Sequence, residues 1–468
     1  MNIKLSFLGA AQNVTGSQYL VQYNNTSFLV DCGLYQEREL KGRNWSPFSI
    51  SPGSLGAVLL THAHLDHCGL LPKLVREGFN QAIYCTGATS EITRIMLLDS
   101  GKIHEEDADF KRRRHERESR KGPYPEIPLY TKDDAEAVSP LFSPVKYGEA
   151  VKIGDGVEAT FYDAGHVLGS SMVKLKIEQN GEARTILFSG DIGRRNKPIL
   201  NDPTFFDEAD YVIVESTYGD RLLERPQDAA NQLAEAINTT AKRGGNVVIP
   251  SFALERSQEL LYYLSKFRLE GRIPHLKVFV DSPMAVEVTG VFERHPELFD
   301  EEMKKLLRQQ KSPFDFPGLN LAGTVDESKA INHMDGSVII IAGSGMCTGG
   351  RIKHHLVNNI SREESTILFV GYQAAGTLGR QIVNGAQRVR MLGQYYPVRA
   401  RIAQLNGFSA HADRDGLVRW LSSLRKPPRR VFVTHGELDA SQHLAGLIRS
   451  SHGWETIVPS YQEQVFLD

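Results

Sequence analysis

The sequence has no excess of charge of either sign. Its 468 residues carry 54 Lys and Arg against 56 Asp and Glu, a net charge of −2, which excludes a polycation or polyanion as a whole. Four cysteines are present without close paired spacing, so neither a disulfide framework nor a thiolate zinc site is indicated; they are Cys32, Cys68, Cys85 and Cys347. No apolar run of about 18 residues could span a bilayer, and no secretion signal precedes the first strand-like segment. We expect a cytoplasmic protein with no membrane partner.

The sequence also lacks internal repeats, low-complexity tracts and the glycine spacing of a P-loop or dinucleotide site. Hydrophobic residues make up 41% and charged residues 24%, which is typical of globular chains. At about 150 residues per domain, the length predicts two or three structural units.

The distribution of elements predicts one domain inserted into another. Short β-rich segments dominate residues 1–215, whereas helical and buried strand patterns alternate over residues 216–400, which is typical of a parallel α/β sheet. From residue 401 onward, strands and histidine loops return. We therefore divide the chain into a first domain formed by 1–215 and 401–468 and an inserted α/β domain formed by 216–400, with the chemistry in the cleft between them.

A charge-dense segment, residues 105–121, contains four consecutive bases from Lys111 to Arg114 and several acids. It is interpreted as an exposed helix or loop. A phosphate-binding patch is one reading; a solvated helix face of mixed charge is the favoured one.

The strongest chemical signal is Thr61-His62-Ala63-His64-Leu65-Asp66-His67, with four metal-ligand side chains directly after an apolar strand. Strand alternation can aim His62 and His64 to the same side, and the following turn can bring Asp66 and His67 toward them. Imidazole and carboxylate are suitable ligands for zinc and related divalent metals. A histidine-rich surface loop is the weaker alternative.

Three further groups each follow a strand in a glycine-flanked loop: His166, Asp191 and His435. A lone histidine in such a place is more often structural, but together with the first cluster these make seven ligands. Two four-coordinate ions require one shared carboxylate, and Asp191 is the candidate bridge. A two-metal site favours hydrolysis of a phosphoryl or carbonyl group.

These residues resemble the metallo-β-lactamase superfamily, whose pattern is His-x-His-x-Asp-His followed by separate His, Asp and His ligands. The resemblance implies that His62, His64 and His166 hold one zinc and that Asp66, His67 and His435 hold the other, with Asp191 between them. It also implies a four-layered αββα sandwich. Asp31 matches a supporting aspartate that orders the metal loop, although it could simply cap a turn.

A narrower resemblance runs through Glu215-Ser216-Thr217-Tyr218-Gly219-Asp220, Asp281-Ser282-Pro283-Met284 and Ser409-Ala410-His411-Ala412-Asp413. These segments are similar to the β-CASP nucleases, which include ribonuclease J and the pre-mRNA 3′-end cleavage endonuclease. The resemblance implies Asp66, Glu215 and His411 as catalytic residues, with His411 as a general acid oriented by Glu215. In the alternative reading, Glu215 is a strand-end ion-pair partner and His411 a helix N-terminal residue.

Other features are weaker. The run Ala342 to Gly350 could present N–H groups to phosphate or form a tight turn. Basic residues of the inserted domain could line a nucleic-acid channel or be ordinary surface charge; they are Arg351, Lys353, Arg380, Arg388 and Arg390. His354 and His355 are expected at the surface.

The predicted function is a metal-dependent ribonuclease that hydrolyses single-stranded RNA with two zinc ions per chain, manganese being the alternative metal. By the resemblance, a histidine at position 435 is typical of the RNA-processing branch, whereas the DNA-processing branch carries valine. The chain ends about 30 residues after His435, so we expect no appended RNA-binding domain. A homodimer is possible. The alternatives are a hydrolase of a small ester or thioester, a DNA-processing β-CASP nuclease, and an inactive RNA-binding subunit, which the complete ligand set disfavours.

Overall fold

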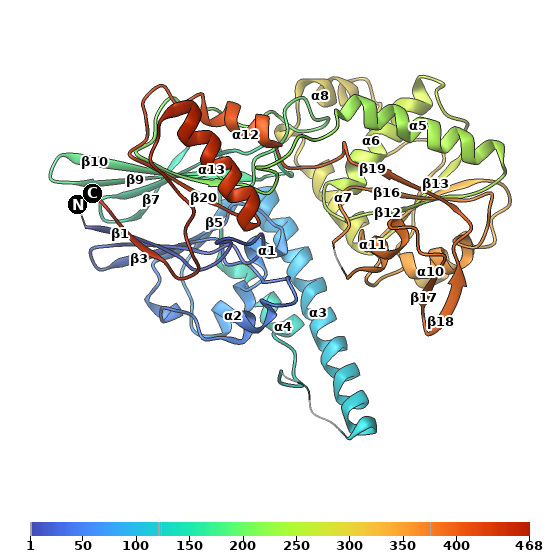
Figure 1. Cartoon of the computed structure of the whole chain (residues 1–468), viewed down its shortest axis with the longest axis horizontal. Coiled ribbons are helices and arrows are strands. Elements are labelled where there is room, and N and C mark those ends of the chain that lie inside the picture. The colour runs from blue at the N-terminus through green and yellow to red at the C-terminus, as the bar shows by residue number, and fades with distance from the viewer. Residues whose placement is uncertain (1, 120–121, 123, 375) are drawn as a thin grey trace. The chain divides into compact units, whose positions relative to one another are not determined.

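The computed structural model describes residues 2–119, 122, 124–374 and 376–468. Its contacts divide the chain into two units (Figure 1). Unit 1 comprises Met1–Arg195, Asp202–Leu222 and His411–Asp468, and unit 2 comprises Asn196–Asn201 and Leu223–Ala410. Among the described residues, no helix combines the length and apolar character needed to cross a membrane.

Unit 1 contains two seven-stranded sheets. The first has the order β22-β1-β2-β3-β4-β5-β6 and the second β21-β20-β11-β10-β9-β8-β7. The strands of the first are β1 (Ile3–Phe7), β2 (Tyr19–Tyr23), β3 (Thr26–Val30), β4 (Ala57–Leu59), β5 (Ile83–Thr86), β6 (Phe142–Val145) and β22 (Gln464–Leu467). Those of the second are β7 (Ala150–Gly154), β8 (Val157–Asp163), β9 (Ser171–Gln179), β10 (Glu182–Phe188), β11 (Tyr211–Glu215), β20 (Arg430–Thr434) and β21 (Thr456–Ile457).

Strand alternation explains how the two sheets pack. In β3, Phe28 and Val30 face the core between the sheets, while Leu29 joins a second core on the outer side, as the two-residue period of a strand requires. The outer core is covered by α1 (Leu65–Cys68), α2 (Leu71–Arg76), α3 (Gly87–Glu118) and α4 (Lys132–Glu136). On the opposite side, α12 (Arg414–Leu421) and α13 (Leu438–His452) cover the second sheet. The predicted αββα sandwich is confirmed.

Unit 2 has a six-stranded, all-parallel sheet in the order β14-β13-β15-β12-β16-β19. Its strands are β12 (Val247–Pro250), β13 (Lys277–Asp281), β14 (Leu319–Leu321), β15 (Val338–Ala342), β16 (Thr366–Val370) and β19 (Arg401–Leu405), and a hairpin adds β17 (Arg388–Met391) and β18 (Gln394–Pro397). Its helices are α5 (Pro226–Lys242), α6 (Arg256–Leu269), α7 (Pro283–Arg294), α8 (Glu301–Arg308), α9 (Val325–Ile331), α10 (Ile352–Asn359) and α11 (Leu378–Val383). Near-continuous apolar strands such as β15 are typical of a parallel sheet covered on both faces, and the inserted α/β domain is present.

The unit boundaries differ in detail from the sequence division. The strand β19 lies after the predicted boundary at residue 401, yet it pairs in parallel with β16 in the sheet of unit 2. A strand pattern alone does not say which sheet a strand joins, so this difference was not readable from the sequence. Residues 196–201 also pack with unit 2, where Leu200 bridges to Phe299.

The charge-dense segment is helical over the described residues up to the end of α3 at Glu118. Residues 120, 121 and 123, which the sequence prediction also included or bordered, lie outside the described residues. Most side chains from Asp109 to Glu118 are exposed, in agreement with the favoured reading as a solvated helix face.

Candidate metal centre

The candidate metal ligands of unit 1 lie where strands end. The parallel strands β10, β11 and β20 finish at one edge of the second sheet, and Asp191 and His435 follow β10 and β20. His166 lies in the turn between β8 and β9, and the segment from His62 to His67 follows β4 of the first sheet. Because carboxyl ends of parallel strands meet at the same edge, residues far apart in the sequence converge here.

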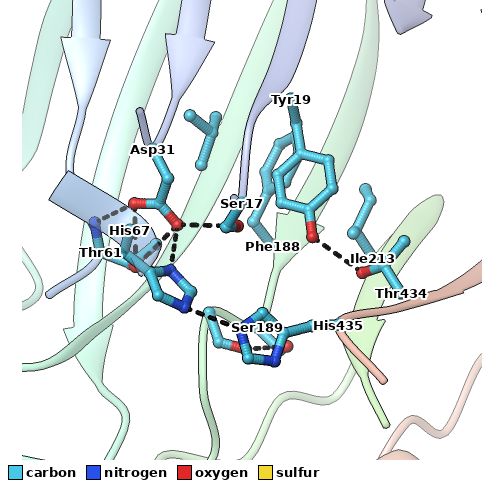
Figure 2. Close-up of a pocket in the computed structure, with 12 residues that line it drawn as sticks. Ser17, Tyr19, Asp31, Thr61, His67, Phe188, Ser189, Ile213, Thr434 and His435 are labelled. Carbon is cyan, nitrogen blue, oxygen red and sulfur yellow. Dashed lines mark hydrogen bonds and ion pairs between the residues drawn. The ribbon is translucent and has the colours of Figure 1, made fainter. Parts of the chain in front are cut away.

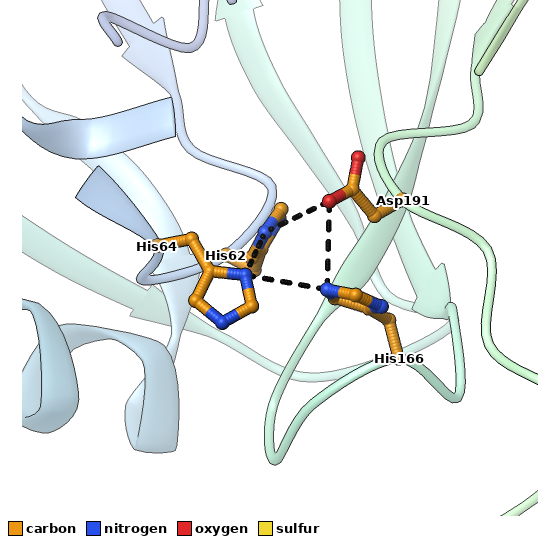
Figure 3. Close-up of side chains that lie close together, drawn as sticks. All are labelled: His62, His64, His166 and Asp191. Atoms are coloured by element: carbon orange, nitrogen blue, oxygen red, sulfur yellow. Dashed lines mark hydrogen bonds and ion pairs between the residues drawn. The ribbon is translucent and has the colours of Figure 1, made fainter. Parts of the chain in front are cut away.

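Four side chains form the first cluster (Figure 3): His62, His64, His166 and Asp191. The Nδ1 atom of His64 lies 3.1 Å from His62 Nε2 and 3.3 Å from His166 Nε2. The Asp191 Oδ2 atom lies 3.4 Å from Nε2 of both His62 and His166. The cluster is therefore a compact set of three nitrogens and one oxygen.

The second cluster contains Asp66, His67 and His435. Nε2 of His67 lies 3.0 Å from Nε2 of His435, and Asp66 Oδ2 lies 3.6 Å from the latter. The second oxygen of Asp191, Oδ1, is 3.4 Å from His67 Nε2 and 3.6 Å from His435 Nδ1. Asp191 thus presents one carboxylate oxygen to each cluster.

The donor sets fit divalent metals. Tetrahedral ligands at zinc bond lengths of 2.0–2.1 Å lie about 3.3 Å from one another, close to the 3.1–3.4 Å spacings of the first cluster. The buried Oδ1 of Asp191 has no hydrogen-bond donor among the described residues, and a buried carboxylate oxygen normally has a partner. All seven predicted ligands are brought together by the fold.

Burial and neighbouring charge set the protonation of the ligands. Burial lowers the pKa of His64 to about 4, which keeps its imidazole neutral and able to ligate. Burial alone would raise the pKa of Asp66, but the hydrogen bond from His435 and the neighbouring histidines lower it to about 2. Burial would lower the pKa of His67, whereas the charges of Asp191 and Asp31 raise it well above its usual value. The site is a concentrated ionic network with little exposure.

Asp31 contacts Thr61 and His67, two residues of the loop that carries four of the candidate ligands (Figure 2). Its Oδ1 accepts a hydrogen bond from the Thr61 N–H at 2.8 Å, and Oδ2 lies 2.7 Å from His67 Nδ1. With Nδ1 directed to Asp31, Nε2 is the ring nitrogen of His67 that faces the second cluster. Partners of this kind fix the tautomer and orientation of ligating histidines.

Glu215 and His411 form a pair beside the clusters. Glu215, the last residue of β11, is 1% exposed and accepts a hydrogen bond from the Ile192 N–H at 2.6 Å. His411 Nδ1 lies 3.1 Å from Glu215 Oε2 and 3.8 Å from Asp191 Oδ2. The Glu215 carboxylate also lies among the potential ligand atoms of Asp191 and His435.

The charge on His411 follows from these neighbours. Burial would lower its pKa, but the charges of Glu215 and Asp191 raise it to about 9. Divalent cations at the adjoining clusters would bring this pKa down, because like charge disfavours the imidazolium. The pair has the composition of a proton donor and the carboxylate that orients it.

Family models match three parts of the chain. The metallo-beta-lactamase superfamily matches residues 12–251, the Beta-Casp domain residues 257–382, and a Zn-dependent metallo-hydrolase RNA specificity domain residues 395–459. The chain belongs to the metallo-β-lactamase superfamily and carries a β-CASP domain.

Several proteins are similar over most of this β-CASP chain. "Ribonuclease TTHA0252" of Thermus thermophilus is 38% identical over 98% of both chains. "Transcription termination factor FttA" of Methanocaldococcus jannaschii is 31% identical over 98% of this chain and 70% of the relative. A crystal structure of a protein of unknown function from Enterococcus faecalis V583 covers 100% of both chains with a TM-score of 0.57 at 12% identity, which shows the fold alone.

Two threonines of this β-CASP chain contact the site, although the sequence reasoning gave them no role. The hydroxyl of Thr61 lies 3.1 Å from His62 Nδ1, and that of Thr217 lies 3.1 Å from His435 Nδ1. Each can fix the ring orientation of a predicted ligand. Their places inside the quoted motifs were a signal, but a threonine hydroxyl has too many common structural uses to be singled out.

The prediction that His355 lies at the surface was wrong. His355 is fully buried on α10, and its Nε2 lies 2.6 Å from Asp281 Oδ2, while Arg351 binds Asp281 Oδ1 at 2.7 Å. Adjacent histidines on a helix point in different directions, and only the fold brings Asp281 to one of them. Arg351 is thus engaged in this buried network.

In the glycine-rich loop after β15, several backbone N–H groups form hydrogen bonds within the loop itself. The Ser344 hydroxyl accepts from the N–H groups of Thr348 and Gly349 at 3.0 and 3.3 Å, and the Ser344 carbonyl accepts from Cys347 N–H. These bonds favour the tight-turn reading over the phosphate-binding one.

Proposed function

We propose that the protein is a ribonuclease that hydrolyses phosphodiester bonds of single-stranded RNA with two zinc ions per chain. The observation that carries the proposal is the shared carboxylate of Asp191. One of its oxygens faces a three-histidine cluster and the other faces a second cluster, with the His411–Glu215 pair at its side. The similarity to a protein named as a ribonuclease supports RNA as the substrate.

When bound, two metal ions supply Lewis acidity that lowers the pKa of a water and stabilises charge on a phosphoryl group. The chain's own residues provide the rest. Asp31 and Thr61 hold the ligand loop in place. Glu215 accepts the Nδ1 proton of His411, so the opposite ring nitrogen, Nε2, is the atom that donates a proton to the departing RNA oxygen. A general acid in this position contributes about 10²–10⁴-fold to the rate.

The test measures metal content and substrate class together. Purified protein is analysed for zinc and manganese by mass spectrometry. Its activity is then measured at one salt concentration on matched single-stranded RNA, single-stranded DNA and duplex DNA. Hydrolysis of a thioester is measured separately, to test the small-molecule alternative. We expect about two zinc ions per chain, preferential RNA cleavage, and loss of activity with a chelator. End-labelled RNA then maps the cleavage positions.

A double variant, His62→Ala with His64→Ala, is the matched negative control because it removes half of the first cluster. Equal or faster DNA cleavage would assign the chain to DNA processing. Thioester hydrolysis without cleavage of any polymer would favour the small-molecule alternative, and a chelator-insensitive, metal-free active preparation would refute the metal mechanism.

A further inference from the structure

The outer half of α3 presents two different faces. One face packs against the segment that follows α3 in the sequence. The ring centroids of His104 and Tyr130 are 4.8 Å apart, and His115 Nδ1 lies 2.6 Å from Glu126 Oε1. Ala108, on the same face, is buried. In Figure 1 this half of α3 extends away from the sheets of unit 1, beyond α2 and α4. The opposite face has no such cover among the described residues.

The uncovered face carries a stripe with seven-residue spacing. Ile103 and Phe110 are 50% and 64% exposed, and Arg117 continues the same line. Both are large apolar side chains that the described part of the chain leaves exposed on one face of the same helix. Positions seven apart fall on nearly the same side of a helix, so Ile103 and Phe110 can contact one partner helix together.

The charges beside this stripe change sign at Phe110. Four of the five residues from Glu105 to Asp109 are acidic, and the four residues from Lys111 to Arg114 are all basic. Asp107 and Arg114 flank the stripe on one side, and Glu106 and Arg113 flank it on the other, each pair again seven residues apart. Within the helix, Asp107 already pairs with Lys111 at 3.9 Å and Arg114 with Glu118 at 3.0 Å, so a partner's charges join or replace these pairs. The face is acidic on one side of Phe110 and basic on the other.

We propose that this face binds the same face of a second copy of the chain, as an antiparallel helix pair with its two-fold axis near Phe110. In that arrangement Phe110 contacts the partner's Phe110. Asp107 faces Arg114 of the partner subunit and Glu106 faces Arg113 of the partner subunit. A two-fold interface requires such a self-complementary surface. A nucleic acid is disfavoured as the occupant because the acidic half would repel its phosphates.

The contact is short. The stripe from Ile103 to Arg117 is about 21 Å long at 1.5 Å per residue. One helix face of that length buries less surface than the roughly 1,200–2,000 Å² of a standard stable interface. The dimer is therefore weak, forms at micromolar concentrations and above, and loosens as salt screens the charge pairs over a Debye length of about 8 Å at physiological ionic strength. The inference concerns assembly and does not depend on the proposed ribonuclease activity.

The experiment is sedimentation and light scattering of the full-length protein over about 1–200 µM at low salt, a range around the affinities of weak complexes. Asp107→Arg and Arg114→Asp each place like charges opposite one another twice per dimer, so each should weaken association at least about 10-fold. The double variant, Asp107→Arg with Arg114→Asp, restores both pairs and should return the dissociation constant to near the wild-type value. Phe110→Ser should weaken association without altering the melting temperature, since the side chain is exposed.

Lys242→Glu, an exposed charge reversal on α5, is the matched control and should leave association unchanged. A monomer at every concentration at low salt would overturn the proposal. So would a dimer that neither single reversal weakens, or a double variant that is no better than the singles. If Arg114→Asp lowered RNA affinity while the mass stayed monomeric, the occupant of this face would be RNA instead.

Discussion

Replacing His411 with alanine should slow RNA cleavage by about 10²–10⁴-fold, the usual contribution of a general acid, or about 3–5 kcal/mol of transition-state stabilisation. The ring is held by the buried Glu215 carboxylate at 3.1 Å, and 20% of the His411 side chain stays exposed. The residue lies outside the two metal clusters. Metal content and RNA affinity should therefore change little.

Glu215→Gln should reduce the rate of RNA cleavage less than His411→Ala does. The glutamine oxygen can still accept the Ile192 N–H, but the negative charge that stabilises the His411 imidazolium is lost. The fraction of protonated acid then falls at neutral pH, and the alkaline limb of the pH–rate profile should move to lower pH. A purely structural role for Glu215 would lower activity without moving that limb.

The assay is single-turnover cleavage of labelled RNA, run beside zinc analysis and a binding measurement. His443→Ala, an exposed histidine of α13, is the control for loss of an imidazole and should be as active as the wild type. Loss of zinc from the His411 variant would refute its assignment as an acid. Full activity of that variant would refute the mechanism.

Three further predictions concern single carboxylates. Asp191→Asn should lose more metal than any single histidine variant, because the carboxylate faces both clusters; retention of two ions by mass spectrometry would contradict this. Asp31→Asn removes the negative charge and one of the two oxygens that accept from Thr61 N–H and His67 Nδ1. It should weaken metal retention about 10–100-fold, as a chelator titration would show. Burial would raise the pKa of Asp281, but hydrogen bonds from His355, Ser328 and Arg351 lower it below 3.8. Its stabilisation is therefore present above that pH and is lost as the pH falls further. Asp281→Asn should cost about 3 kcal/mol at neutral pH, and the difference from the wild type should shrink in urea unfolding below pH 3.8.

Local patterns predicted the parts of the site that lie within one loop. The spacing from His62 to His67 after a strand was enough to predict that these four side chains share a cavity. The αββα sandwich followed from a family resemblance. Strand periodicity is consistent with it, as the alternation of Phe28, Leu29 and Val30 between two cores shows.

What the sequence did not reveal depends on which elements become neighbours. The placement of β19 in the sheet of unit 2 and the burial of His355 against Asp281 both arise from pairing between distant strands and helices. The side-chain pattern of β19 suits either sheet, and a histidine looks the same in sequence whether or not a carboxylate lies beside it in the fold. Partner choice across long sequence separations is a property of the whole fold.

The parallel pairing of β11 with β20 has a consequence for synthesis of the protein. Glu215 lies opposite Thr434 in that ladder, and most of unit 2 is translated between them. A nascent chain that has reached residue 400 already holds His62, His64, His166 and Asp191, yet it lacks His411 and His435. Pairing β11 with β20 closes a long loop, which costs conformational entropy, and it can occur only after β20 has been made. Until translation has passed residue 435, the nascent chain therefore lacks part of the candidate metal centre, and until it has passed residue 411 it also lacks the histidine that we propose as its general acid.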